Sequence, residues 1–149
     1  MKVLMIDALV GSDYSECLCS ALKNTGTDIA LIVPENKSTR DTIEFPLLKW
    51  LPTKDKQASK LAKIFKFLFY LIRVLNNIRQ NKVDIVHYQF FRRKSEVLFF
   101  YLLKLLKVKL VYTAHNVMPH ENGRFDFKIQ SFVLKTATAI IAHTQTRNS

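Results

Sequence analysis

Short apolar runs alternate with longer amphipathic segments along the 149 residues of the chain. The runs are rich in valine, isoleucine and leucine, and turn-forming residues such as glycine, proline, asparagine and aspartate follow several of them. This pattern predicts strands at residues 2–6, 28–33, 42–51, 83–87, 107–113 and 138–142. Pro46 would confine the strand at 42–51 to an edge of the sheet, because proline cannot donate a ladder hydrogen bond.

Between these runs, apolar residues recur at three- and four-residue spacing, which predicts helices. They are expected at residues 15–24, 54–80, 97–106 and 125–135. In the helix at 54–80, one stripe of large apolar side chains is expected to pack on the sheet. This stripe consists of Leu61, Ile64, Phe65, Leu68, Leu71, Ile72, Leu75 and Ile78. Phe67, Phe69 and Tyr70 fall outside it.

Strands that alternate with helices indicate an α/β fold, here a Rossmann-like, doubly wound parallel sheet with helices on both faces. Connections between parallel strands are right-handed, so the carboxyl ends of all strands are expected on one rim. The loops after four of the strands should meet there. They carry Gly11 and Ser12, His87, residues 115–121, and His143.

Composition places the chain among folded domains, since 48% of its residues are hydrophobic and its length suits one core. We therefore predict a single domain at residues 1–149. Cys17 and Cys19 are the only cysteines, which supports neither a zinc site nor a disulfide framework and favours a reduced, cytoplasmic setting. The apolar run at the N-terminus is too short for a signal peptide.

The net charge of +11 is concentrated in the middle of the chain, because residues 54–109 hold fourteen Lys/Arg against three Asp/Glu. Such a basic block indicates an anionic partner, either a phospholipid surface or a nucleic acid. Arg92-Arg93-Lys94 lacks the interleaved aromatics of a nucleic-acid stacking platform. The apolar run Phe67 to Ile72 is far shorter than the ~20 residues that span a bilayer, but it could lie on one. The predicted membrane-facing residues are Lys56, Lys60, Lys63, Lys66, Phe67, Phe69 and Tyr70.

Candidate chemistry gathers where the strand at 107–113 ends. His115 lies between Thr113 and Asn116, and His120 and Glu121 follow closely. Several titratable groups at a strand rim are typical of a binding or catalytic site, although His115 could instead cap the loop.

Other site classes find little support. The histidines lack the His-Glu-x-x-His order of a zinc protease, so no metal is expected. The loop after the first strand lacks Gly-x-Gly-x-x-Gly, no Gly-x-Ser-x-Gly elbow occurs, and a glycosidase-like carboxylate pair would have only Asp7 and Glu121. We therefore expect no NAD or other cofactor.

Three blocks resemble, in order and spacing, the N-terminal half of the glycosyltransferases of family four and their GT-B relatives. They are residues 84–87, residues 111–121, which read Val-Tyr-Thr-Ala-His-Asn-Val-Met-Pro-His-Glu, and residues 139–144. The middle block is the most specific. Asn116 stands where an aspartate is frequent, and the paired glycines usual in the first loop are missing at Gly11-Ser12.

The resemblance implies a two-domain enzyme that moves a sugar from a nucleotide-sugar, its substrate, to a glycan or lipid-linked acceptor. Residues 1–149 would be the acceptor-side half, and the donor-binding C-terminal domain is absent from this chain, so the chain alone should be inactive. His115 would be the catalytic residue. The residues implied to line the cleft are Gly11, Ser12, His87, Asn116, His120 and Glu121. The enzyme would be cytoplasmic and peripheral on the inner membrane face.

Two alternative functions from other classes of protein remain open. The first is a standalone flavodoxin-like binding or regulatory module. The second is a basic nucleic-acid-binding domain.

Overall fold

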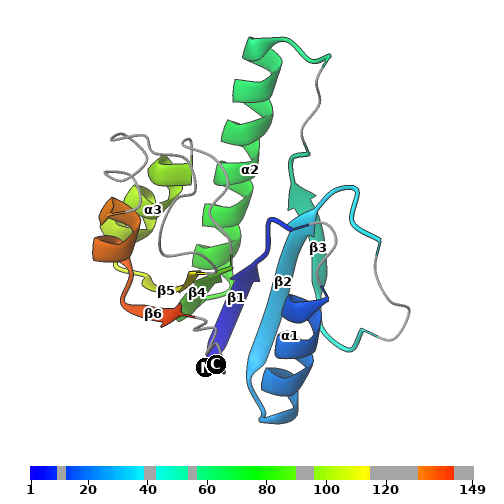
Figure 1. Ribbon diagram of the computed structural model, residues 1–149, viewed down its shortest axis with the longest axis vertical. Helices are drawn as coiled ribbons and strands as arrows, with labels where there is room; N and C mark the ends of the chain where they lie inside the picture. The colour runs from blue at the N-terminus through cyan, green and yellow to red at the C-terminus, as the bar shows by residue number, and fades with distance from the viewer. Residues whose placement is uncertain (10–12, 39–42, 54–56, 90–95, 115–130, 143–149) are drawn as a thin grey trace, which may run out of the picture.

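A computed structural model describes residues 1–9, 13–38, 43–53, 57–89, 96–114 and 131–142. Within these residues, six strands pair in parallel in one sheet, in the order β3-β2-β1-β4-β5-β6 (Figure 1). The strands are β1 (Lys2–Ile6), β2 (Asp28–Pro34), β3 (Leu47–Leu51), β4 (Ile85–Tyr88), β5 (Lys109–Ala114) and β6 (Ala139–Ala142). The predicted α/β class with a parallel sheet is confirmed.

The strand order distinguishes between two doubly wound folds. Here β1 lies between β2 and β4, which is the Rossmann order, whereas a flavodoxin-like sheet places its third strand beside its first. The flavodoxin-like interpretation is therefore wrong in its topology. The Rossmann order also puts the carboxyl ends of β1, β4, β5 and β6 side by side, which confirms the predicted meeting of these strand ends.

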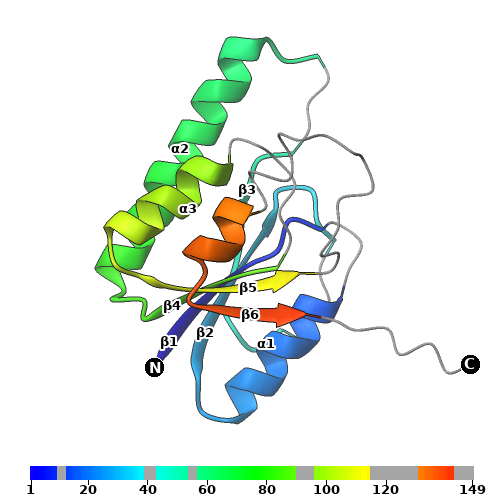
Figure 2. The same cartoon turned by 60° about the vertical axis from the view of Figure 1, so that its left-hand side comes forward.

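Helices cover both faces of the sheet, as predicted (Figure 2). Helix α1 (Tyr14–Asn24) packs on one face, where Cys19 joins β1 and β2 side chains such as Met5 and Leu31. Helices α2 (Lys60–Gln80) and α3 (Glu96–Leu105), with a helical segment at residues 131–136, pack on the other. Because both faces of the central strands are buried, β1 and β2 are apolar nearly throughout rather than alternating.

The larger core lies between the sheet and the α2–α3 side. Its centre is aromatic: Tyr88 of β4 meets the ring edge of Phe100 at a centroid distance of 5.0 Å, and Phe100 meets Tyr112 of β5 at 6.4 Å. Edge-to-face pairs of this kind are favoured by the ring quadrupoles. Helix α3 is thereby fixed over the two strands that lead into the candidate site.

The largest differences from the predicted element boundaries are at β3 and α2. Strand β3 begins at Leu47, after Pro46, while the preceding Phe45 is buried on the α1 side instead of extending the strand. Helix α2 begins after Ser59, whose Oγ accepts a hydrogen bond from the backbone N of Ala62 at 3.2 Å. A serine in this position satisfies a free N–H group of the first turn, so the helix starts there and not at residue 54. After the end of α1, Gly26 adopts φ +81°, a left-handed conformation that glycine adopts without strain and that commonly ends a helix.

The face of α2 that packs on the sheet is not the predicted stripe. Tyr70, Leu71, Val74 and Ile78 are buried, and Phe67 is half-buried against the same core. The prediction that Phe67 and Tyr70 face a membrane is therefore wrong. Only Leu71, Leu75 and Ile78 of the predicted stripe contact the core; the exposed remainder is Leu61, Ile64, Phe65, Leu68 and Ile72.

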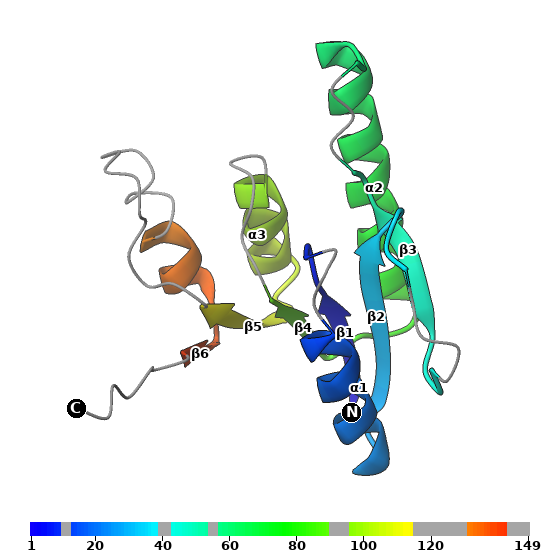
Figure 3. The same cartoon turned by 45° about the vertical axis from the view of Figure 1, so that its right-hand side comes forward.

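The reason is visible in the direction of α2. Its N-terminal half extends past the ends of β1 and β2, so no sheet lies beneath it (Figures 1 and 3). Arg73, in the C-terminal half of the helix, stacks over the ring of Trp50 on β3 at 4.1 Å, within the part of α2 that contacts the sheet.

Candidate functional site

The carboxyl rim of the sheet is the candidate site, and its described part is built by the ends of β4 and β5 and by the residues that follow β1 and β4. Two backbone hydrogen bonds continue the sheet past β1: Asp7 N donates to Ile32 O, and Gln89 N donates to Ile6 O, both at 2.9 Å. The rim is therefore regular up to the point where the loops begin.

His87 is the one sequence-predicted rim residue whose side chain the structure describes. It is 5% exposed, and its Nε2 lies 2.8 Å from Thr113 Oγ1 on β5 and 3.3 Å from Gln89 Nε2. Burial lowers the pKa of His87 from 6.5 to about 4, so the ring is neutral at physiological pH. His87 thus ties the end of β4 to the end of β5, two residues before His115.

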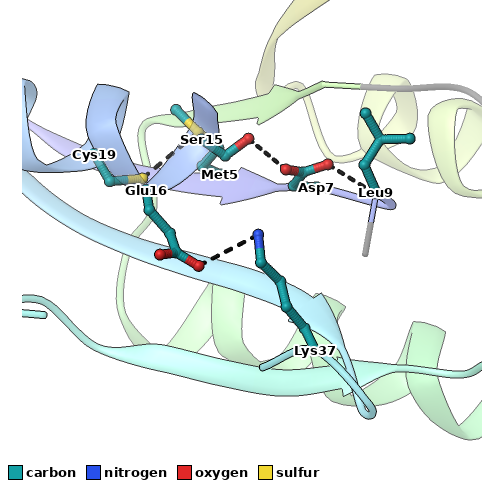
Figure 4. A network of polar contacts seen from close by, with 7 residues as sticks. All are labelled: Met5, Asp7, Leu9, Ser15, Glu16, Cys19 and Lys37. Carbon is teal, nitrogen blue, oxygen red and sulfur yellow. Dashed lines mark hydrogen bonds and ion pairs between the residues drawn. The ribbon is translucent and has the colours of Figure 1, made fainter. Parts of the chain in front are cut away.

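Asp7 plays a similar role at the end of β1 (Figure 4). Its carboxylate accepts hydrogen bonds from the backbone N of Leu9 at 2.8 Å and from Ser15 Oγ at 2.6 Å, and it is fully buried. Leu9 and Ser15 flank the loop that carries Gly11 and Ser12. The aspartate therefore fixes the base of that loop and is committed to structure, which removes it as half of a carboxylate pair.

A buried ion pair lies beside this aspartate. Glu16 in the first turn of α1 and Lys37, after β2, are both buried, with Lys37 Nζ 3.3 Å from Glu16 Oε1 (Figure 4). Because each charge would be costly to bury alone, the pair holds the start of α1 against the end of β2.

Cys19 completes the cluster beneath the rim. Its Sγ lies 3.5 Å from Met5 Sδ, and burial, with a smaller contribution from Asp7, raises the pKa of the thiol to about 12. Cys19 therefore stays protonated and unreactive. Cys17 is exposed, and both thiols are free.

Most of the predicted site lies outside the described residues. This applies to the predicted catalytic residue and to five of the predicted cleft residues: His115, Gly11, Ser12, Asn116, His120 and Glu121. It applies also to Lys56, His143 and the Arg92–Lys94 run. Their roles stay predictions.

The sequence pattern did not predict the contacts that four polar residues make in the structure: Thr113, Gln89, Ser15 and Lys37. Thr113 and Gln89 had a detectable signal, because each is a polar residue at or just past the end of an otherwise apolar strand. The Glu16–Lys37 pair had none, since it joins residues 21 positions apart that only the fold brings together.

Within the described ranges, no three His, Cys, Asp or Glu side chains lie close enough to hold a metal ion. No helix in those ranges has both the length and the apolar content that crossing a bilayer requires.

Solved structures share this fold. MurG of Acinetobacter baumannii superposes with a TM-score of 0.67 at 14% identity, over 97% of this chain and 42% of MurG. A glycosyltransferase from Rickettsia africae gives 0.63 at 19% identity, over 95% and 36% of the two chains. The glycosyltransferase SsfS6 of Streptomyces sp. SF2575, complexed with thymidine diphosphate, gives 0.54 at 14% identity, over 91% and 43%. The chain spans less than half the length of each.

No curated protein is significantly similar to the sequence. The profile of glycosyltransferase family 4, in contrast, matches residues 14–146, which is nearly the whole chain and includes the ends of β4 and β5, the His115 segment and β6. With the sheet order and the rim, this match assigns the chain to glycosyltransferase family 4.

Proposed function

We propose that this chain is the acceptor-side half of a glycosyltransferase that moves a sugar from a nucleotide-sugar donor to a glycan or lipid-linked acceptor. One observation carries the proposal: the family match at residues 14–146 covers both the hydrogen-bonded ends of β4 and β5 and the segment that contains His115. Ligands of open α/β sheets bind at the carboxyl ends of the strands, which is the rim described above.

The parts of the rim have different tasks in this proposal. The neutral His87 and Thr113 hold the end of β5, and Asp7 holds the base of the first loop. These groups are buried and position the loops rather than touch the sugar. His115, which follows β5 in the sequence, would stabilise the charge that develops as the sugar leaves the nucleotide.

The donor and the remaining half of the active site are also part of the proposal. SsfS6 carries thymidine diphosphate in a chain of which this protein matches 43%, which supports a nucleotide-bound donor held by a second domain. A Rossmann-like half on its own offers one wall of a cleft. The 149-residue chain therefore binds acceptor but does not transfer sugar by itself. We further propose that the complete enzyme works in the cytoplasm, at the inner membrane face.

A transfer assay tests this. The chain and a version extended along its reading frame through a second domain would be incubated with radiolabelled nucleotide-sugars and membrane or glycan extracts. We expect product only from the extended version. We also expect His115→Ala to lower its turnover by roughly a hundredfold or more, the usual cost of losing a group that stabilises transition-state charge, with an unchanged melting temperature.

Two outcomes would contradict the proposal. Turnover by the 149-residue chain would show that it holds a complete active site. An unchanged rate in the extended His115→Ala variant would return His115 to a capping role.

A further inference from the structure

Helix α2 carries a second apolar stripe that the sheet does not cover. Successive residues of an α-helix are rotated by ~100°, which places the six exposed residues on a common arc of about 140°. They are Leu61, Ile64, Phe65, Leu68, Phe69 and Ile72, hereafter the outer stripe. The buried residues Tyr70, Leu71, Val74 and Ile78 centre on a direction roughly 130° away. The outer stripe is therefore a separate face and not the edge of the core.

The exposure of the outer stripe is high for such side chains. Leu61 and Phe65 are each 69% exposed and Phe69 is 68% exposed, over a helix segment about 15 Å long. Single exposed apolar residues are ordinary on protein surfaces, but a contiguous row of six marks an interaction site. Some partner surface should cover this row.

The charges on α2 indicate which surface that is. Lys60, Lys63 and Lys66 occupy the arc opposite the outer stripe, and the 21 residues of α2 include no aspartate or glutamate. The N-terminal half of α2 (residues 60–69, hereafter the projecting half) is thus a short amphipathic helix with one aliphatic and aromatic face and an opposite face on which every charged residue is a lysine. That combination is typical of helices that lie in the interface of an anionic membrane. A protein partner would more commonly meet a mixed-charge rim.

The neighbouring helix supports a broad contact surface. Helix α3 lies beside α2 on the same side of the sheet (Figure 2), and it exposes Leu98, Tyr101 and Leu105 at three- and four-residue spacing. The exposed Lys104 lies beside this row. The apolar and basic character therefore extends across the α2–α3 side and is not confined to one helix.

We propose that the outer stripe of α2 inserts into the headgroup region of an anionic phospholipid membrane, with Lys60, Lys63 and Lys66 adding electrostatic attraction. Helix α2 runs opposite to the strands, so its N-terminal half lies at the same end of the molecule as the carboxyl rim (Figures 1 and 3). A membrane contacted there would be adjacent to the rim. The idea that this membrane supplies a lipid-linked acceptor to the rim rests on the proposed function. The membrane contact itself does not.

Vesicle co-sedimentation of the 149-residue chain is the test. Vesicles of phosphatidylcholine with 30% phosphatidylglycerol, a composition chosen as the probe, would be compared with pure phosphatidylcholine in 50 mM and 500 mM salt. We expect strong binding to the anionic vesicles at low salt and a large decrease at high salt, because surface charge is screened within a Debye length of ~4 Å near 0.5 M. Equal retention on both lipids would overturn the electrostatic part.

Two variants locate the contact. Phe65→Ser with Phe69→Ser should weaken binding to anionic vesicles by roughly tenfold or more, because apolar area no longer leaves water on insertion. The control is Ile140→Ser, which removes an apolar side chain on β6 that is also exposed, and it should bind as the unchanged chain does.

Replacing Lys60, Lys63 and Lys66 by glutamine should weaken binding about a hundredfold at low salt, or roughly fivefold for each lysine. The matched control replaces the exposed Lys23, Lys49 and Lys135 by glutamine, which lowers the net charge equally. Equal weakening by both triple variants would show diffuse attraction without a site and would overturn the proposal.

The alternative occupants give different results. If the outer stripe instead joins two copies of the chain, Phe65→Ser with Phe69→Ser will change the sedimentation velocity without changing vesicle binding, which would overturn the membrane contact. Vesicle binding requires no sugar transfer. A complete enzyme that transfers sugar but ignores vesicles would therefore remove this inference alone, and a chain that binds vesicles but supports no transfer when extended would remove only the proposed function.

Discussion

The two halves of helix α2 present similar rows of large apolar residues to very different surroundings. From Tyr70 onward, the row faces the sheet, and Tyr70, Leu71, Val74 and Ile78 form part of the main core. Before Tyr70, the helix extends beyond the sheet, and most of its apolar residues face outward while lysines occupy the side that would have continued the packed face. Helical periodicity therefore shows that a face is apolar, but not what covers it. A covered face contributes to folding stability, whereas an uncovered one is available for binding.

The largest expected effect comes from comparing substitutions at two adjacent residues of α2. Tyr70 is 3% exposed and Phe69 is 68% exposed. Tyr70→Ala should lower the free energy of unfolding by about 3–5 kcal/mol, since it leaves a cavity in the core, whereas Phe69→Ala should change it by less than about 0.5 kcal/mol. Urea denaturation measures both. Similar losses for the two variants would show that the outer stripe is packed after all.

Lowering the pH should also affect the two regions differently, because only the sheet-bound region contains a buried group that gains a proton on unfolding. His87 has a folded pKa of about 4 against 6.5 when unfolded, so the unfolded chain binds the proton more readily between these values. Stability is then complete above about pH 6.5 and falls as the pH drops towards 4, with about 2.5 kcal/mol lost by pH 4.5. The projecting half of α2 contains only lysines and apolar residues and should contribute nothing to this slope.

Urea titrations at pH 7 and pH 4.5 measure the loss. His87→Gln is the control, because it removes this one group and leaves the carboxylates to titrate as before. The difference between the pH dependence of unfolding free energy in the unchanged chain and in the variant gives the contribution of His87. Parallel pH profiles for the variant and the unchanged chain would contradict the burial of a neutral ring against Thr113.

The smallest effect is expected at the far end of the projecting half. Ser59→Ala removes the hydrogen bond that Ser59 Oγ accepts from Ala62 N and should cost about 1 kcal/mol of local helix stability. Because the first turns do not pack on the sheet, the loss should appear as faster amide exchange there without a matching change in global unfolding. Ser20→Ala, at an exposed position within α1, should leave exchange in α2 unchanged. A fully global loss would indicate that the first turns are coupled to the core.

Much of the architecture could be predicted because its signals are local. The apolar runs between turn residues predicted all six strands, and β1 and β2 were placed within a residue of their observed bounds. The prediction was poorer where a cap or a proline decided the boundary. Ser59 sets the start of α2, and Pro46 ends the part of residues 42–51 that was wrongly expected to be strand.

The site was predictable only in part. The rim was expected because parallel strands with right-handed crossovers must end on one side, and the end of β4 does meet the end of β5 there. The burial of His87 could not be predicted, because the sequence pattern of a histidine at a strand end is the same whether its side chain faces a cleft or the adjacent strand. Its contact with Thr113, 26 positions away, depends on the pairing of β4 with β5.

The sequence by itself determined that this chain is an α/β domain with a parallel sheet, a polar cluster after its fifth strand and a strongly basic middle, because these follow from local periodicity and composition. Only the tertiary structure decided the strand order, the partners of Asp7, Glu16 and His87, and the face of α2 that is left uncovered. Each of these depends on which distant residues are brought together. The apolar residues of α2 satisfy two helical stripes equally well, and the sheet covers only one of them.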